Sequence, residues 1–142
     1  QSLAQELGVT ERVLFYGQIE HAEMPKYLQA SDIFIRPSRS EGMGNSFVEA
    51  MATGLPVIAT QEGGIADFLF DEKKNPEQTT TGWAVEKDSP AEIAEAVIDI
   101  IERPDKVQEV TKTAKEMVLA QYDWDLIAQK MKREVFSPLF SA

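Results

Sequence analysis

The chain has 142 residues, 43% hydrophobic and 27% charged, which is the size and composition of one ordinary globular domain. It contains no cysteine and a single histidine, His21. Disulfides, thiolate nucleophiles and cysteine-ligated metal centres are therefore excluded, and a histidine-based metal site or a serine-protease triad is disfavoured. The net charge of −10, from 24 acidic and 14 basic residues, comes with no basic segment that would bind a nucleic acid backbone.

The sequence shows neither a membrane-spanning segment nor a signal peptide. The apolar runs are only a few residues long, too short to cross a bilayer, and no basic amphipathic helix is present. The opening stretch, QSLAQELGVTER, has neither the basic nor the apolar region of a signal peptide. Because it also lacks an initiator methionine, we expect the chain to be part of a longer protein.

Four short apolar runs bounded by glycine or proline predict strands. They occupy residues 13–17, 33–35, 56–60 and 82–85. Continuous apolar runs of this length are typical of strands buried on both faces, as in a parallel sheet. Four strands are few for a doubly wound sheet, so we expect leading strands of the sheet to be missing.

Helical patterns alternate with these strands, and after the last strand the rest of the chain is predicted to be helical. They occupy residues 25–30, 45–53 and 63–70. Ser89, Pro90 and Glu92 form a capping box that starts a longer helix, which Pro104 ends, and two more helices follow. The polar stretch 71–81 predicts an exposed loop. The apolar side chains expected to face inward are Ile93, Ala96, Val97, Ile100 and Ile101 in the first helix, Val107, Val110, Ala114, Met117 and Val118 in the second, and Trp124, Ile127, Ala128, Met131 and Val135 in the third.

The order of these elements predicts an α/β domain. We expect a Rossmann-like parallel sheet flanked by helices, with strand and helix alternation over residues 10–88 and a helical C-terminal tail over residues 89–142. The whole of 1–142 would form one partial domain. Ligands of such sheets bind beyond the carboxyl ends of the strands.

The segment 36–46, after the second strand, has the residues of a binding site. Gly42 and Gly44 lead into a helix, whose free N–H groups attract an anion, and the carboxylates of Glu41 and Glu49 flank them. Each feature also has a simpler explanation. The two glutamates could be a coincidence in an acidic protein, the glycines could make an ordinary turn, and Arg36 and Arg39 could be solvated.

The combination of these features resembles the C-terminal, donor-binding domain of GT-B-fold glycosyltransferases, the large retaining family often called group 1. The run RPSRSEGMGNSFVEAMATGLPVIATQEGG carries the hallmarks of that domain in order. They are Pro37-Ser38, Glu41, Gly42, Gly44, residues 49–52, Gly54, residues 56–60 and Gly63-Gly64. The resemblance covers roughly residues 10–135.

The resemblance implies a role for each matching residue. Glu41 would be the catalytic residue of this half, contacting the donor sugar and diphosphate, and Glu49 would hold the ribose hydroxyls in charge-assisted hydrogen bonds. The diphosphate would contact the segment between them, namely Gly42, Met43, Gly44, Asn45 and Ser46. Gly17 and Gln18 would lie near the nucleobase, although a plain turn explains them equally well.

The chain also departs from the family pattern. Met43 stands where the family usually has an aromatic residue, and Asp67 where it usually has glutamate. The arginine and lysine that neutralise the departing diphosphate in the family belong to earlier loops that this chain lacks. The family's often-discussed histidine belongs to the N-terminal domain, so we expect His21 to lie in an exposed loop.

The implied function is the transfer of a hexosyl group from a UDP- or GDP-linked sugar to an acceptor with retention of configuration. The family generally works without a metal, and no other cofactor is implied. This chain would be the donor-binding part only, inactive alone, because the acceptor domain is missing. The alternatives are a sugar-nucleotide epimerase of the same fold and a non-catalytic α/β interaction module. The base, the sugar and the acceptor cannot be read from the sequence.

The expected partners are the nucleotide-sugar and the missing N-terminal acceptor domain, and not nucleic acid. Trp124, Ile127 and Met131 would form an apolar stripe that either packs on its own domain or drives self-association or a domain swap. We expect a cytoplasmic location, with peripheral attachment to the inner face of a membrane through the missing part as an alternative.

Overall fold

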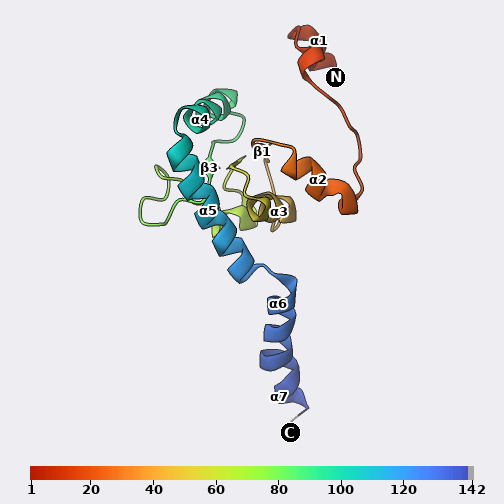
Figure 1. Cartoon of the computed structure of the whole chain (residues 1–142), viewed down its shortest axis with the longest axis vertical. Coiled ribbons are helices and arrows are strands. Elements are labelled where there is room, and N and C mark those ends of the chain that lie inside the picture. Colours follow the sequence, from red (N-terminus) through yellow and green to blue (C-terminus); the bar gives the residue numbers. More distant parts are fainter. Residues whose placement is uncertain (141–142) are drawn as a thin grey trace.

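The computed structural model describes residues 1–140 and contains a three-stranded parallel sheet. The strands are β1 (Phe34–Arg36), β2 (Val57–Ala59) and β3 (Trp83–Ala84), in the order β1-β2-β3. The register pairs Ile35 with Ile58 and Ile58 with Trp83. Three of the four predicted strands are therefore confirmed, and so is the Rossmann-like sheet with flanking helices (Figure 1).

Helices cover both faces of the sheet. The first face packs on α2 (Met24–Gln29), α3 (Asn45–Thr53) and the later part of α5 (Pro104–Gln121). The second packs on α4 (Pro90–Glu102) and the start of α5. In β2 the side chains of Val57 and Ala59 enter the first core cluster while Ile58 enters the second, so this strand is buried on both faces as its apolar run predicts.

Local signals fix the ends of the main helices. α3 is flanked by Gly44, which has a φ of +74°, and by Gly54, which has a φ of +87°. The amides of Gly54 and Leu55 donate to the carbonyls of Met51 and Ala50. This is a glycine-capped helix end. In α4, the Ser89 hydroxyl accepts a bond from the Glu92 amide at 3.4 Å, which confirms one half of the predicted capping box. The Glu92 carboxylate instead accepts the amide of Glu86 at 2.8 Å.

The predicted strand over residues 13–17 is wrong. This segment follows α1 (Ser2–Glu6) and a 3₁₀ turn, η1 (Thr10–Arg12), and passes outside the sheet to a second turn, η2 (His21–Glu23), and α2 (Figure 1). Its side chains are exposed, Leu14 by 74%. The apolar run indicates extended backbone, but a strand also needs a neighbour to accept its hydrogen bonds. Within residues 1–140 this segment has no such neighbour.

Two further expectations need correction. Residues 63–70 form a 3₁₀ helix, η3 (Gly63–Asp67), instead of a longer helix. Ile101, predicted to face inward, is 70% exposed, because the core beneath α4 covers only the side that carries Ala96 and Ile100.

The stretch 71–81 is a loop and is mostly exposed, as predicted, but its two ends are held by hydrogen bonds. Asp71 accepts bonds from the amides of Lys73 and Lys74 and also from Ala84 in β3, so its carboxylate covers the open edge of that strand. Thr81 is buried and bonds the backbone of Phe68 and Phe70.

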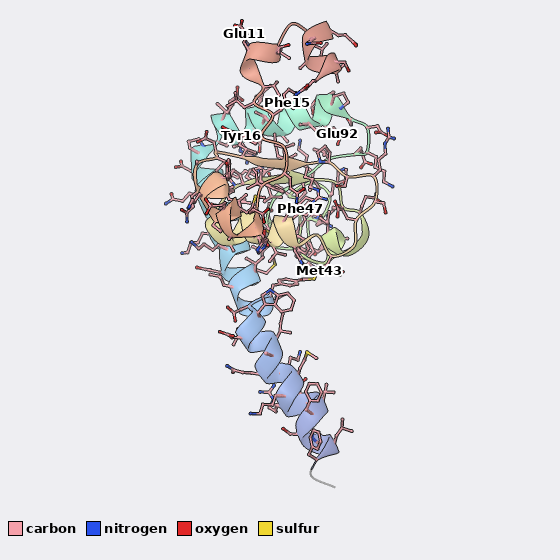
Figure 2. All side chains as sticks on the ribbon, turned by 90° about the vertical axis from the view of Figure 1, so that its right-hand side faces the viewer. Glu11, Phe15, Tyr16, Met43, Phe47 and Glu92 are labelled. Carbon is pink, nitrogen blue, oxygen red and sulfur yellow. The ribbon has the colours of Figure 1, made fainter. Side chains whose placement is uncertain are left out.

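The last helices of the described residues form a helical rod that extends away from the sheet (Figures 1 and 2). It comprises α6 (Trp124–Met131), a π-helical segment, η4 (Lys132–Phe136), and α7 (Ser137–Leu139). The predicted helical tail is confirmed, but the expectation that its apolar side chains face inward is wrong for Trp124, which is 75% exposed, and for Met131 and Val135, while Ile127 is half-buried. Among the helices of the described chain, none combines the length and the apolar composition that crossing a membrane requires.

Candidate functional site

Three loops meet where the strands end at their carboxyl termini. The loop after β1 is joined to β2 by a bond from the Thr60 hydroxyl to the Ser38 carbonyl, 2.6 Å long. It is joined to the loop after β3 by the Arg39–Asp88 ion pair at 2.8 Å. The predicted segment 36–46 is therefore held at the edge of the sheet where ligands of such folds bind.

Close backbone packing shapes the loop that leads into α3. The Gly64 amide donates to the Gly42 carbonyl at 2.8 Å. A Cβ atom at Gly63 would lie 2.0 Å from the carbonyl oxygen of Glu41, and one at Gly64 would lie 2.9 Å from that of Gly42. The pair Gly63-Gly64 is therefore more than an ordinary strand-to-helix junction, since the loop 41–44 rests directly on it.

The Glu41 side chain is anchored inside this loop. One of its oxygens, Oε1, accepts the Ser38 hydroxyl at 2.6 Å and pairs with Nη2 of Arg36 at 2.8 Å. Nη1 of Arg36 donates to the Ser46 hydroxyl at 2.7 Å, and the guanidinium lies over the Phe47 ring, 5.5 Å from its centre. Glu41 is only 12% exposed.

Glu49 lies about one turn after the start of α3, and its side chain faces α2. Its Oε1 lies 3.0 Å from Nε2 of His21 in η2. Beside this pair is an apolar cavity of about 250 Å³ between the two helices, to which Met24, Leu28 and Ala52 contribute. His21 is exposed, as predicted, but its contact with Glu49 is something that the sequence did not indicate.

The predicted site residues fall into two groups. The larger group is brought together at the start of α3 and consists of Glu41, Gly42, Met43, Gly44, Asn45, Ser46 and Glu49. Met43 lies at the surface, where its side chain is exposed (Figure 2). Gly17 and Gln18 lie in the exposed segment before η2, and among residues 1–140 no hydrogen bond joins either to the first group.

Arg36 is the site residue that sequence reasoning missed. The simpler explanation, a solvated side chain, is only partly right: Arg36 is 50% exposed, but it also contacts Glu41, Ser46 and Phe47. The available signal was its position: it ends β1 and directly precedes the Pro37-Ser38 pair, so its side chain must enter the same loop.

A second charged cluster lies on the far side of β3 and supports the fold. Asp99 accepts bonds from Nε1 of Trp83 at 2.7 Å and from Lys106 and Arg103, each at 3.0 Å. Burial alone would raise the pKa of Asp99, but these hydrogen bonds outweigh it and lower the pKa to about 2. Across the described residues, no group of three or more histidine, aspartate or glutamate side chains is placed to hold a metal ion.

The fold and these loops define a Rossmann-like domain with a glycine-containing loop that leads into α3 at the carboxyl edge of its sheet. The family model described as "Glycosyl transferases group 1" matches residues 1–117. The chain therefore belongs to the group 1 glycosyltransferases, and the predicted family and GT-B fold are confirmed.

Individual relatives agree with this assignment. The chain is 32% identical over 138 residues to a GDP-mannose-dependent alpha-(1-6)-phosphatidylinositol monomannoside mannosyltransferase of Mycobacterium tuberculosis, covering 92% of this chain and 34% of that protein. It superposes on sucrose-phosphate synthase from Thermosynechococcus elongatus with a TM-score of 0.84 and 32% identity, covering 99% of this chain and 33% of that one. It superposes on Anabaena HepE in complex with UDP with a TM-score of 0.84 and 25% identity, covering 96% of this chain and 35% of that one. The chain thus spans about a third of the length of these relatives.

Proposed function

We propose that this chain binds the donor of a hexosyltransferase, a nucleoside-diphosphate sugar carrying UDP or GDP. The observation that carries the proposal is the loop 41–44, which rests on Gly63-Gly64 and presents Glu41 and Glu49 on either side of the start of α3. The printed names of relatives include a GDP-mannose-dependent enzyme and a complex with UDP, which supports donors of this class.

Each residue is assigned the part of the donor that suits its chemistry. Glu41 faces the sugar. The amides of the segment 42–46 face the diphosphate, because the N–H groups at a helix start stabilise negative charge. Glu49 holds the ribose hydroxyls, and its Oε2 has no partner within residues 1–140. Gly17 and Gln18 lie toward the base.

The chemistry that we propose is departure of the nucleoside diphosphate, with the acceptor entering on the same face so that configuration is retained. The amides of the segment 42–46 and the anchored Glu41 would stabilise charge that develops as the glycosidic bond breaks. No metal is required in this scheme.

The acceptor would come from a separate N-terminal domain, so this chain alone should bind donor without transferring the sugar. Detectable transfer by the purified chain would contradict that part.

The proposal also includes a partner for the exposed helical rod and a location for the protein. The helical rod of α6, η4 and α7 would pack on the acceptor domain, and without it would drive self-association. Sedimentation velocity at several concentrations should show oligomers that Trp124→Glu weakens, whereas a concentration-independent monomer would contradict self-association. We propose a cytoplasmic location. The alternative, peripheral attachment to a membrane through a part outside this chain, is supported by the mycobacterial relative, which is named for a lipid acceptor.

The test is calorimetric titration of UDP, GDP and ADP into this chain. One nucleotide should bind, and Glu49→Ala should weaken it about tenfold or more, since hydrogen bonds to a charged group contribute about 1.5–3 kcal/mol. Glu95→Ala, an exposed carboxylate on α4, is the matched control and should leave the affinity unchanged. Failure of all three nucleotides to bind, or equal effects of the two substitutions, would contradict the proposal.

A further inference from the structure

Arg36 joins the two halves of the loop that precedes α3. It ends β1, and its guanidinium makes one contact with Glu41, before the two glycines, and another with Ser46, after them. The ring of Phe47 supports it from one side at 5.5 Å. A planar guanidinium with fixed donor directions suits such a double contact, because it sets the distance between its two partners.

The contacts of Glu41 are unequal at its two oxygens. Both the Ser38 hydroxyl and Nη2 of Arg36 bind Oε1, at 2.6 and 2.8 Å. Within the described part of the chain, Oε2 has no hydrogen-bond or ion-pair partner. One oxygen therefore fixes the carboxylate, and the other is left to bind a ligand.

The contact with Ser46 has a similar consequence. The Ser46 oxygen accepts the bond from Nη1 of Arg36. A hydroxyl that accepts from a cation has its own proton free to donate elsewhere. Arg36 thus leaves the Ser46 hydroxyl free to donate to a ligand at the start of α3.

We propose that Arg36 is a positioning residue for Glu41. With Ser38 it holds Oε1, so that Oε2 is presented to the sugar of the donor. This inference rests on the proposed donor-binding function and adds to it the residue that orients the sugar-binding carboxylate.

Arg39 provides a matched comparison in the same loop. It is also an arginine in an ion pair, but its partner is Asp88, in the loop after β3. Among residues 1–140 Arg39 has no contact with Glu41 or Ser46. Any effect of Arg36→Met that Arg39→Met reproduces is therefore a general effect of removing positive charge.

The first experiment follows the side-chain carboxyl carbon of Glu41 by NMR in the ligand-free chain. Arg36→Met and Ser38→Ala should each move this resonance, while Arg39→Met should leave it in place. Arg36→Lys should move it partway, because an ammonium can pair with Glu41 but cannot also reach Ser46 in the same fixed geometry. An unmoved Glu41 resonance in Arg36→Met would overturn the proposal.

The second experiment measures affinity for GDP and GDP-mannose, and for UDP and UDP-glucose. Arg36→Met should weaken the nucleotide-sugar about tenfold relative to its nucleotide, as misplacing one charged hydrogen bond implies. When Glu41 is already replaced by alanine, adding Arg36→Met should not change the ratio of nucleotide-sugar affinity to nucleotide affinity any further. Equal weakening of nucleotide and nucleotide-sugar, persisting without Glu41, would show direct binding of the diphosphate and overturn this inference alone. A chain that binds none of the four ligands would overturn the proposed function, and this inference with it.

Discussion

Replacing Gly63 by alanine should damage the candidate site and the fold together. Gly63 has a φ of +56°, and a Cβ atom there would lie 2.0 Å from the carbonyl oxygen of Glu41 and 3.1 Å from that of Gly42. The atoms in the way are backbone, so no side-chain rotation can make room. The loop 41–44 must move away from η3.

The expected loss has two parts. The left-handed conformation costs an alanine about 1–2 kcal/mol. Moving the loop also breaks the bond from the Gly64 amide to the Gly42 carbonyl, which adds about 1 kcal/mol. We expect Gly63→Ala to lower the free energy of unfolding by about 2–3 kcal/mol in total.

Gly54→Ala is the matched control for the conformational part. Gly54 has a φ of +87°, at the end of α3, but no atom lies within 4 Å of a Cβ atom placed there. It should therefore lose only about 1–2 kcal/mol. The difference between the two variants measures the close approach of the loop to Gly63.

Urea denaturation followed by tryptophan fluorescence measures both losses. Trp83 is buried and reports on the core, and a Trp124→Phe background removes the signal of the exposed tryptophan. Gly63→Ala should also weaken nucleotide binding where the chain is still folded, while Gly54→Ala should not. Equal losses of stability in the two variants, with equal nucleotide affinity, would refute the argument that the loop rests on Gly63.

Two further predictions concern the fold. Asp99, whose pKa is lowered to about 2, should stabilise the chain by about 2 kcal/mol above pH 4, and this contribution should fade as the pH drops toward 2. Urea denaturation at pH 7 and pH 3 should show that Asp99→Asn loses that stability and its acid dependence, whereas Glu95→Gln keeps both; an unchanged acid dependence in Asp99→Asn would contradict the assignment. Ser89→Ala should cost about 1 kcal/mol in the same assay by removing the cap of α4, and a stability equal to that of the wild type would show that the 3.4 Å bond to the Glu92 amide contributes nothing.

The elements that the sequence predicted correctly are those whose signals are local. α3 was predicted at its observed bounds because Gly44, Gly54 and Pro56 mark both of its ends within a few residues. β2 was predicted from an apolar run that suits burial on two faces. These signals need no knowledge of what lies across the fold.

The elements that were missed depend on neighbours remote in the sequence. Residues 13–17 have the composition of a strand, but pairing is decided by the segment alongside, which periodicity cannot identify. The contacts of Arg36 with Glu41 and Ser46 need the loop to fold back on itself, and that depends on Gly63-Gly64. Ile101 fits the helical period of α4, yet the core beneath that helix is too narrow to cover it.

The contacts that order the candidate site all lie within this chain. Arg36 and Ser38 fix Glu41, and Thr60 ties the loop to β2, whereas the exposed Arg39–Asp88 pair makes no contact with Glu41 or Ser46 among the described residues. Exposed apolar side chains line residues 13–16 and the C-terminal rod, and Met43 is exposed in the candidate site itself. If the proposed function is right, we expect this chain to bind the donor without transferring the sugar, because these contacts come from its own residues. This separation is what makes nucleotide affinity, measured on the chain as it stands, a fair test of the proposed function.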